Sequence, residues 1–408
     1  INSELEEMGE IQGAGKAMIL RKITLPLVLP AILSAVILTF SKAIGTFGTI
    51  NYLGSPVQYY TLSSQLYMNI NSRDTQTGFA MAILMIIIAS IAVFVNQKLI
   101  GSRKSYATIG GKGGRSTLIG LGKVGRPVIT AALFVFFAVG IIMPIVILVM
   151  ESFMLKEGIY SLDNFTLHYW IGESNPQIME GLPGIFKNDE FINSLFNSLR
   201  LTLVNGVFGT IFGQLLGYIT AKGRGRLHGK LVEQLVFIPY LIPSVAFGGI
   251  YLSMFSQPQQ IFGVTLVPAL YGTFALLTLV SVVKHLPFAA RAGTSNMLQI
   301  SGELEEAATI EGAGFFRRFV KIVFPLSKGG FISGFMLIFV SIMKELDLII
   351  LIMTPTTSTL PYLAFRYQNG NSPQASDCVA IVMFSIVFLV YAIANLSGKA
   401  DLAKSMAG

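Results

Sequence analysis

Apolar stretches without a charged residue recur along the chain, and each is long enough to cross a membrane. A helix of about 20 apolar residues spans a hydrocarbon core of about 30 Å. Gln234–Val283 holds 50 uncharged residues, too many for one crossing, and the polar run Ser256–Gln260 divides it into two predicted spans. Four further stretches qualify, the first of them slightly short: Gly78–Val95, Val128–Met150, Leu201–Ala221 and Cys378–Gly398.

Two more predicted spans are interrupted by charged side chains. Pro30–Leu53 contains Lys42. Gly329–Met353 contains three charged residues close together, Lys344, Glu345 and Asp347. The total is then about eight spans. Because backbone polar groups in lipid are satisfied only in helices or closed barrels, the pattern predicts an all-α polytopic membrane protein.

Composition supports this interpretation. Hydrophobic residues make up 53% of the 408 and charged residues only 12%, with a mean hydropathy of +0.67. Soluble domains carry about a quarter charged residues. A single apolar stretch is often a buried helix of a soluble protein, but six or more in one chain argue against that alternative.

The charges of the segments that connect the predicted spans indicate on which side of the membrane each segment lies. Seven basic residues and no acid lie between Asn96 and Pro127, and Ala221–Lys230 adds four more. The connection Glu151–Glu190 instead holds seven acids and two lysines. Since Lys and Arg favour the cytoplasmic side, the first two segments are predicted inside and the third outside. The net charge of +8 reflects this bias, and short basic loops do not suit nucleic-acid binding.

No catalytic or metal-binding constellation is apparent. Cys378 is the single cysteine, and His168, His228 and His285 are expected in separate loops or span ends without ligand spacing. No segment matches the phosphate-binding pattern G-x-x-x-x-G-K-[ST]. We therefore predict no catalytic residue, no metal site and no cofactor bound by this chain.

An internal repeat links the two ends of the chain. A shift of 299 residues aligns Ile1–Leu27 with Ile300–Leu326, with 13 identical positions of 27. The same shift pairs Pro56 with Pro355, and after a one-residue gap Thr61 pairs with Thr359. Duplicated halves are common in transporters.

Each copy of the repeat reads as an acidic helix, a glycine turn and a basic stretch. Glu303–Ile310 has acids in its first turn, where the helix dipole favours them. Gly312 and Gly314 are expected to end that helix. Phe315–Phe324 then runs to Pro325 at the membrane surface. One copy could be an ordinary solvated loop, but two in register favour a docking element on the cytoplasmic side.

These copies resemble the EAA signature of permease subunits in binding-protein-dependent ABC importers. The signature runs E-A-A, three residues, G, nine residues, I, one residue, L-P. The second copy fits it at Glu306, Ala307, Ala308, Gly312, Ile322 and Pro325, with Phe324 in place of Leu. The first copy fits it at Glu7, Gly13, Ile23, Leu25 and Pro26, with Met8 and Gly9 in place of the alanines.

The resemblance implies that both copies are coupling segments inserted into clefts of cytoplasmic ATPase subunits. The implied coupling residues are Glu7, Gly13, Gly15, Pro26, Glu306, Ala307, Ala308, Gly312, Gly314 and Pro325. The implied partners are two ATP-binding subunits, which carry ATP and magnesium, an extracytoplasmic substrate-binding protein and the lipid bilayer, with no nucleic acid.

Other stretches look like the fused permeases of ferric-iron importers: Gly45–Pro56, Tyr218–Val245 and Met343–Pro355. That likeness implies a type I ABC importer permease fold, a multi-pass location in the bacterial plasma (inner) membrane and ferric iron as the first choice of substrate. Thiamine, phosphonate and sugar-phosphate permeases are near relatives and remain alternatives.

The repeat also predicts the domain organisation. Residues 1–97 are expected to form the C-terminal part of a first permease half, with a coupling segment and two spans. Residues 98–127 form a basic cytoplasmic linker, and residues 128–408 a complete second half of six spans with its coupling segment at 300–326. The first half lacks about four spans, so we expect a fragment of a longer fused permease.

The charged cluster in the predicted seventh span is a candidate for the translocation pathway. Lys344, Glu345 and Asp347 are expected about 30 Å along the helix from Pro325, near the outer leaflet. Charges at such depth face a cavity or one another, so a cluster paired within itself is the alternative. The aligned first-half positions are Gly45, Thr46 and Gly48, which carry no charge.

Three classes of function compete at this point. A secondary transporter or channel needs no paired docking element, which favours the importer. A membrane enzyme needs a nucleophile and base or a metal, and the sequence offers neither.

Overall fold

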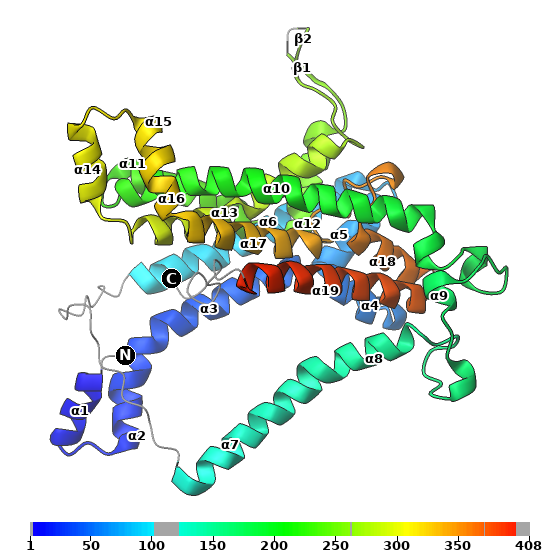
Figure 1. The fold of residues 1–408 in the computed structure, drawn as a ribbon, viewed down its shortest axis with the longest axis horizontal. Coiled ribbons are helices and arrows are strands. Elements are labelled where there is room, and N and C mark those ends of the chain that lie inside the picture. The colour runs from blue at the N-terminus through cyan, green and yellow to red at the C-terminus, as the bar shows by residue number, and fades with distance from the viewer. Residues whose placement is uncertain (1–2, 102–121, 262, 371, 397–408) are drawn as a thin grey trace.

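The computed structural model describes residues 3–101, 122–261, 263–370 and 372–396, and these are mainly helical (Figure 1). Up to residue 151 the elements are α1 (Ser3–Ile11), α2 (Lys16–Ile19), η1 (Leu20–Thr24), α3 (Leu25–Gly45), α4 (Gly48–Gly54), η2 (Ser55–Val57), α5 (Leu62–Asn71), α6 (Thr75–Gly101), α7 (Gly122–Phe137), η3 (Ala138–Ile142) and α8 (Met143–Glu151).

The elements that follow include one short β-hairpin. They are η4 (Leu162–Asn164), α9 (His168–Ile171), η5 (Met179–Gly181), η6 (Ile185–Lys187), α10 (Asp189–Lys222), α11 (Leu227–Leu241), α12 (Ser244–Phe255), β1 (Gln259–Ile261), β2 (Val264–Val267), α13 (Phe274–Met297), α14 (Gly302–Ile310), α15 (Phe315–Arg318), η7 (Phe319–Val323), α16 (Phe324–Leu326), α17 (Lys328–Met343), η8 (Pro355–Thr357), α18 (Leu360–Asn369) and α19 (Pro373–Leu396).

Five to seven candidate membrane spans are present in the described residues, where the sequence predicted about eight. Five continuous helices are long and apolar enough, namely those within 75–92, 122–151, 189–222, 274–297 and 373–396. Two bent pairs add the others: α11 with α12, which meet at 97°, and 315–326 with α17, which meet at 75°. The predicted division at Ser256–Gln260 is confirmed, because the β-hairpin lies there.

Two predicted spans are not continuous helices. Within Pro30–Leu53 the helix stops at Gly45 and α4 begins at Gly48. Within Gly329–Met353 the helix stops at Met343, just before the charged cluster. Both stretches were predicted as spans interrupted by charged residues, and the structure shows that the helix itself ends within each of them.

The sequence repeat is also a structural repeat. The pairs α1 and α14, α2 and α15, and η1 and η7 have equal lengths, and each pair begins 299 residues apart. Beyond the break, α5 and α18 both have 10 residues and begin 298 residues apart, as the one-residue gap predicts. Both acidic helices lie toward the same end of the molecule in Figure 1, and α9 lies at the opposite end.

The tightest packing joins α10, α13 and α17. Small residues line the buried face of α10 at Gly206, Gly209, Gly213 and Gly217. A Cβ added at Gly213 would lie 2.3 Å from Ala289 Cβ on α13. Because lipid tails are as apolar as side chains, close backbone approach of this kind holds membrane helices together. By contrast, the continuous helix 122–151 has none of its 18-residue apolar window buried.

Replacing Gly213 by leucine should destabilise this packing by about 1–3 kcal/mol or more, because the added atoms have no room against α13. Gly140→Leu is the matched control, since no atom lies within 4 Å of a Cβ added at Gly140. Thermal unfolding of both purified variants in detergent measures the difference. Equal unfolding midpoints for Gly213→Leu and the unchanged protein would contradict the packing described here.

Candidate functional site: a central cavity and two paired segments

The two copies of the repeat meet at equivalent residues. The backbone N–H of Gly48 donates to Asp347 Oδ1 at 2.9 Å, and the two residues are 299 positions apart. When a residue contacts the equivalent residue of the other copy, both lie at the axis that relates the two copies. Gly48 and Asp347 therefore mark one point on a pseudo-two-fold axis.

A second pair of equivalent residues marks another point on this axis. Tyr67 of α5 and Phe365 of α18 are 298 positions apart, and their rings meet edge to face with centroids 6.1 Å apart. Phe47 packs against both rings, at 4.6 Å from Tyr67 and 5.5 Å from Phe365. Tyr52 completes this aromatic cluster at 5.6 Å from Phe365.

The cavity on the coupling-segment side of the axial contact measures about 760 Å³. Residues of α3 and α17 that precede the two breaks line it, together with parts of α11, α13 and α19. It contains all three members of the predicted pathway cluster, Lys344, Glu345 and Asp347. Their first-half equivalents Gly45 and Thr46 line the same cavity, so it receives both copies of the repeat. We call it the inner cavity.

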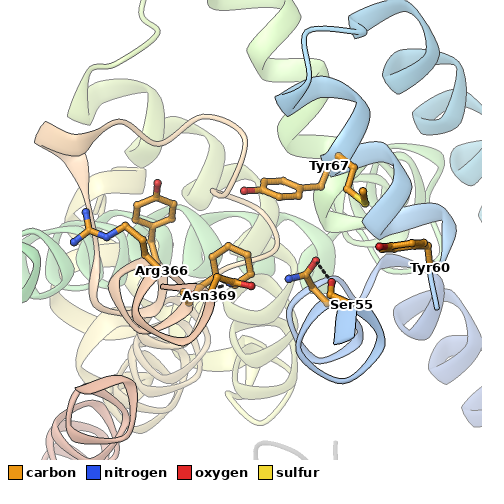
Figure 2. A pocket seen from close by; sticks show the side chains of 9 residues that line it. Ser55, Tyr60, Tyr67, Arg366 and Asn369 are labelled. Atoms are coloured by element: carbon orange, nitrogen blue, oxygen red, sulfur yellow. Dashed lines mark hydrogen bonds between the residues drawn. The ribbon is translucent and has the colours of Figure 1, made fainter. Parts of the chain in front are cut away.

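A smaller cavity of about 360 Å³ lies between residues that follow the breaks. Figure 2 shows Tyr60 and Tyr67 on one side and Arg366 and Asn369 of α18 on the other. Nη2 of Arg366 donates to Glu190 Oε2, so the charge of this side chain is already paired. Tyr67 and Phe365 line this cavity and belong to the aromatic cluster, which therefore forms part of its wall.

Both carboxylates of the pathway cluster are already partnered. Glu345 Oε1 accepts from the N–H of Leu348 at 2.9 Å, and Oε2 lies 3.4 Å from His285 Nε2. His285 Nδ1 lies 2.9 Å from the carbonyl of Ser281. Both ring nitrogens of His285 therefore face oxygen acceptors. The alternative of a cluster paired within itself was wrong, because Glu345 pairs with His285 of α13.

His285 was not found from sequence. It was expected at a span end or in a loop, but it lies inside α13 and is 3% exposed. Its neighbour Lys284 was likewise overlooked, and its Nζ donates to the carbonyls of Pro239, at 2.9 Å, and Ile242. These carbonyls end α11 at the bent joint. A charged pair inside an otherwise uncharged run was the available signal.

The second coupling segment, residues 300–326, turns at Gly312. This residue has a φ of +76°, and Gly13 in the first copy has a φ of +84°. Such values favour glycine, since a side chain there costs about 1–2 kcal/mol. Arg318 closes the turn by donating at 3.0 Å to Thr309 Oγ1 and to the carbonyl of Ala313. Gly15 and Gly314 precede the next helix in extended conformation.

One acidic residue of each coupling segment is held by a side chain of the fold: Glu305 is buried and its copy Glu6 is half-buried. Glu305 is 8% exposed and accepts from the Tyr218 hydroxyl at 2.6 Å, and its other oxygen pairs with Lys222 at 2.6 Å. Its copy Glu6 accepts from Thr24 Oγ1 at 2.7 Å. The signature residues Glu306 and Glu7, in contrast, are exposed.

Apolar side chains are exposed at the tip of each segment. Ile11 and Ile310 are equivalent residues, 86% and 85% exposed. Ala307 is exposed beside them, whereas Ala308 is half-buried. Pro26 and Pro325 lie at the second positions of α3 and α16, where the missing N–H costs nothing. The ten predicted coupling residues therefore lie in two matching elements, each with an exposed apolar end.

The first copy departs from the signature for a packing reason. A Cβ added at Gly9, where the signature has alanine, would lie 2.9 Å from Ile23 Cδ1 and 3.2 Å from Ile19 Cγ1. Ile19 takes the place of Arg318 in the second copy. The branched side chain fills the space that an alanine methyl would need.

Comparison with known proteins identifies a family. The family model described as "Binding-protein-dependent transport system inner membrane component" matches residues 1–106 and 209–400. A ferric transport system permease protein of Actinobacillus pleuropneumoniae is 22% identical over 100% of this chain and 56% of its own length. The chain thus spans about half the length of that relative.

Other relatives match about half of this chain. A sulfate transport system permease of Synechocystis is 26% identical over 50% of the chain and 71% of its own length. A molybdate/tungstate transport system permease of Thermococcus kodakarensis is 28% identical over 50% of the chain and 76% of its own length. The solved structure of a bacterial alginate importer superposes with a TM-score of 0.52 at 16% identity, covering 66% of this chain and 94% of that one. That structural likeness shows the permease fold.

Glu305→Gln should loosen the second coupling segment, because it removes the charge that Tyr218 and Lys222 hold. The pair is partly exposed, so we expect a loss of about 1 kcal/mol, or about fivefold faster opening. Hydrogen exchange of the amides in α14, followed by mass spectrometry, measures this opening. Glu306→Gln is the matched control and should leave the exchange unchanged. Identical exchange in both variants would argue against the tether.

Proposed function

The chain belongs to the family of binding-protein-dependent transport system inner membrane components, multi-pass permeases with the ABC importer fold, and on this premise we propose that it passes a substrate inward when partner subunits hydrolyse ATP. In this family the ATPase is a separate subunit from the permease. The activity, the substrate and the partners of the whole protein are therefore proposed.

The paired coupling segments are the observation that carries the proposal. Two equivalent elements, each a nine-residue helix followed by a glycine turn, present exposed apolar ends toward one end of the molecule. Two ATPase subunits need two such docking elements. A secondary transporter or channel needs neither, and this disfavours the alternative function.

We assign the partners from the same geometry. The segments at 1–27 and 300–326 dock on two cytoplasmic ATP-binding subunits, which hold ATP and magnesium. The opposite end, where the acidic connection Glu151–Glu190 lies, receives the extracytoplasmic substrate-binding protein. Residues 1–97 then supply the end of a first half and residues 128–408 the second half, joined by the linker 98–127, of which 102–121 lie outside the described residues.

Ferric iron is the proposed substrate. Support comes from the ferric transport permease that matches along this entire chain. The sulfate and molybdate/tungstate permeases that match half of the chain make an oxyanion the second candidate. In the described residues, no group of three or more His, Cys, Asp or Glu side chains is placed to hold a metal ion. Iron therefore passes without a multidentate protein site among those residues.

Reversing the charge at Glu306 should uncouple transport. In proteoliposomes with both partner subunits and the binding protein, we expect Glu306→Lys and Gly312→Leu to lower uptake more than tenfold at equal amounts of folded permease. An exposed carboxylate at a docking surface attracts basic groups, and lysine repels them. The same reversal at Glu157, in the outer connection, is the control and should leave uptake unchanged. Normal uptake in both coupling variants, or ATP hydrolysis by the permease alone, would contradict the assignment.

The substrate is tested in the same proteoliposomes. We expect labelled ferric iron to accumulate in an ATP-dependent way, and labelled sulfate, molybdate and thiamine to accumulate less. Comparison requires the cognate binding protein, loaded with each compound in turn. Accumulation of thiamine or of a sugar phosphate in preference to iron would overturn the substrate assignment and leave the importer class intact.

A further inference from the structure

We infer that the inner cavity binds an oxygen-rich anion, held by one lysine from each half of the permease. This inference rests on the proposed transport function and names the substrate class. The ligand is either a free oxyanion or ferric iron carried in an anionic oxygen chelate.

The argument begins with which charges in the cavity are available. Besides two tyrosines, six side chains with acidic or basic groups line it: Lys42, Lys284, His285, Lys344, Glu345 and Asp347. Four of them are engaged by the fold. Glu345 is held by His285 and Leu348, Asp347 by the N–H of Gly48, and Lys284 by two carbonyls at the end of α11.

Lys42 and Lys344 remain. Both are exposed, and among the described residues no carboxylate forms an ion pair with either of them. Lys42 Nζ lies 5.4 Å from the centroid of the Tyr240 ring, a contact that leaves its donors open. The two charged side chains of the cavity that make no hydrogen bond or ion pair among the described residues are therefore both positive.

The two lysines enter the same cavity from different halves of the permease. Lys42 lies on α3 of the first half, and Lys344 directly follows α17 of the second. Their equivalents in the opposite halves are Ser341 and Gly45, which also line the cavity. The two lysines therefore come from opposite halves of the repeat. Lys344 corresponds to position 45 of the first half, three residues and about one helical turn after Lys42.

Uncharged donors complete a site for oxygen atoms. The hydroxyl-bearing residues Thr46, Ser244 and Ser341 line the same cavity. An ammonium binds sulfate-like or carboxylate oxygens as a point charge, and hydroxyls donate to the remaining oxygens. A bare metal cation, or the cationic ring of thiamine, would instead meet three ammonium groups against two carboxylates. Charges inside a membrane protein are costly, which makes two unpaired ones a functional feature.

Equilibrium binding to the full-length permease in nanodiscs tests the site at low salt. The probes are sulfate, molybdate and ferric citrate, with thiamine as the cation. We expect an anionic probe to bind, and Lys42→Gln and Lys344→Gln each to weaken it about tenfold, the effect of losing one charge-assisted hydrogen bond. Lys344→Arg should retain binding. Lys156→Gln, an exposed lysine of the outer connection, is the matched control and should not change it.

The results with the different probes distinguish a free oxyanion from chelated iron as the ligand. They also distinguish a wrong anion site from a wrong proposed function. Sulfate and molybdate binding without ferric citrate assigns free oxyanions, and the reverse assigns chelated iron. Absence of anion binding, equal binding of thiamine, or unchanged affinity in both glutamine variants would overturn the inference. ATP-driven uptake by the same preparation is measured in parallel. Uptake without any lysine effect refutes the anion site alone, whereas no uptake of any probe refutes the proposed function.

Discussion

The contact between the Asp347 carboxylate and the Gly48 backbone amide fixes the arrangement of the rest of the structure. It joins a residue to its own copy across the axis, and it does so where a helix in each half has just ended. Inside an apolar environment, the amides and carbonyls freed by a break must find partners. Asp347 supplies one for Gly48, Glu345 supplies one for Leu348, and Lys284 supplies one for the end of α11. Three charged side chains therefore satisfy backbone groups at three helix breaks.

The breaks in turn create the cavities. A continuous helix would fill the axis with its own backbone, whereas a helix that stops leaves room beside it. The aromatic cluster of Phe47, Tyr52, Tyr67 and Phe365 occupies the axis beyond the breaks. Leu346 and Ile350 belong to the same buried group, which draws on both copies of the repeat. The aromatic cluster and the inner cavity thus lie on the two sides of the helix breaks.

Much of this architecture follows from short-range sequence features, and the rest depends on contacts across the chain. Uncharged runs predicted the apolar helices, and a 299-residue shift predicted that the two segments match, because both are local patterns. The partners of Glu345 and Asp347 could not be predicted from the sequence, because His285 and Gly48 lie far from them along the chain. The bend between α11 and α12 was missed for the same reason: the uncharged run continues through it, and the carbonyl partner lies on α13.

The second copy of the repeat, residues 300–326, rests on α10, and this helix also packs against α13 beside the inner cavity. Glu305 is anchored to Tyr218 and Lys222, which lie in the last turns of α10. The same helix packs through Gly213 and Gly217 directly onto the backbone of α13.

Helix α13 carries Lys284 and His285 into the inner cavity. Close-packed contacts transmit displacement because they have little free volume to absorb it. In the second half, then, residues 300–326 and the cavity wall share one rigid support.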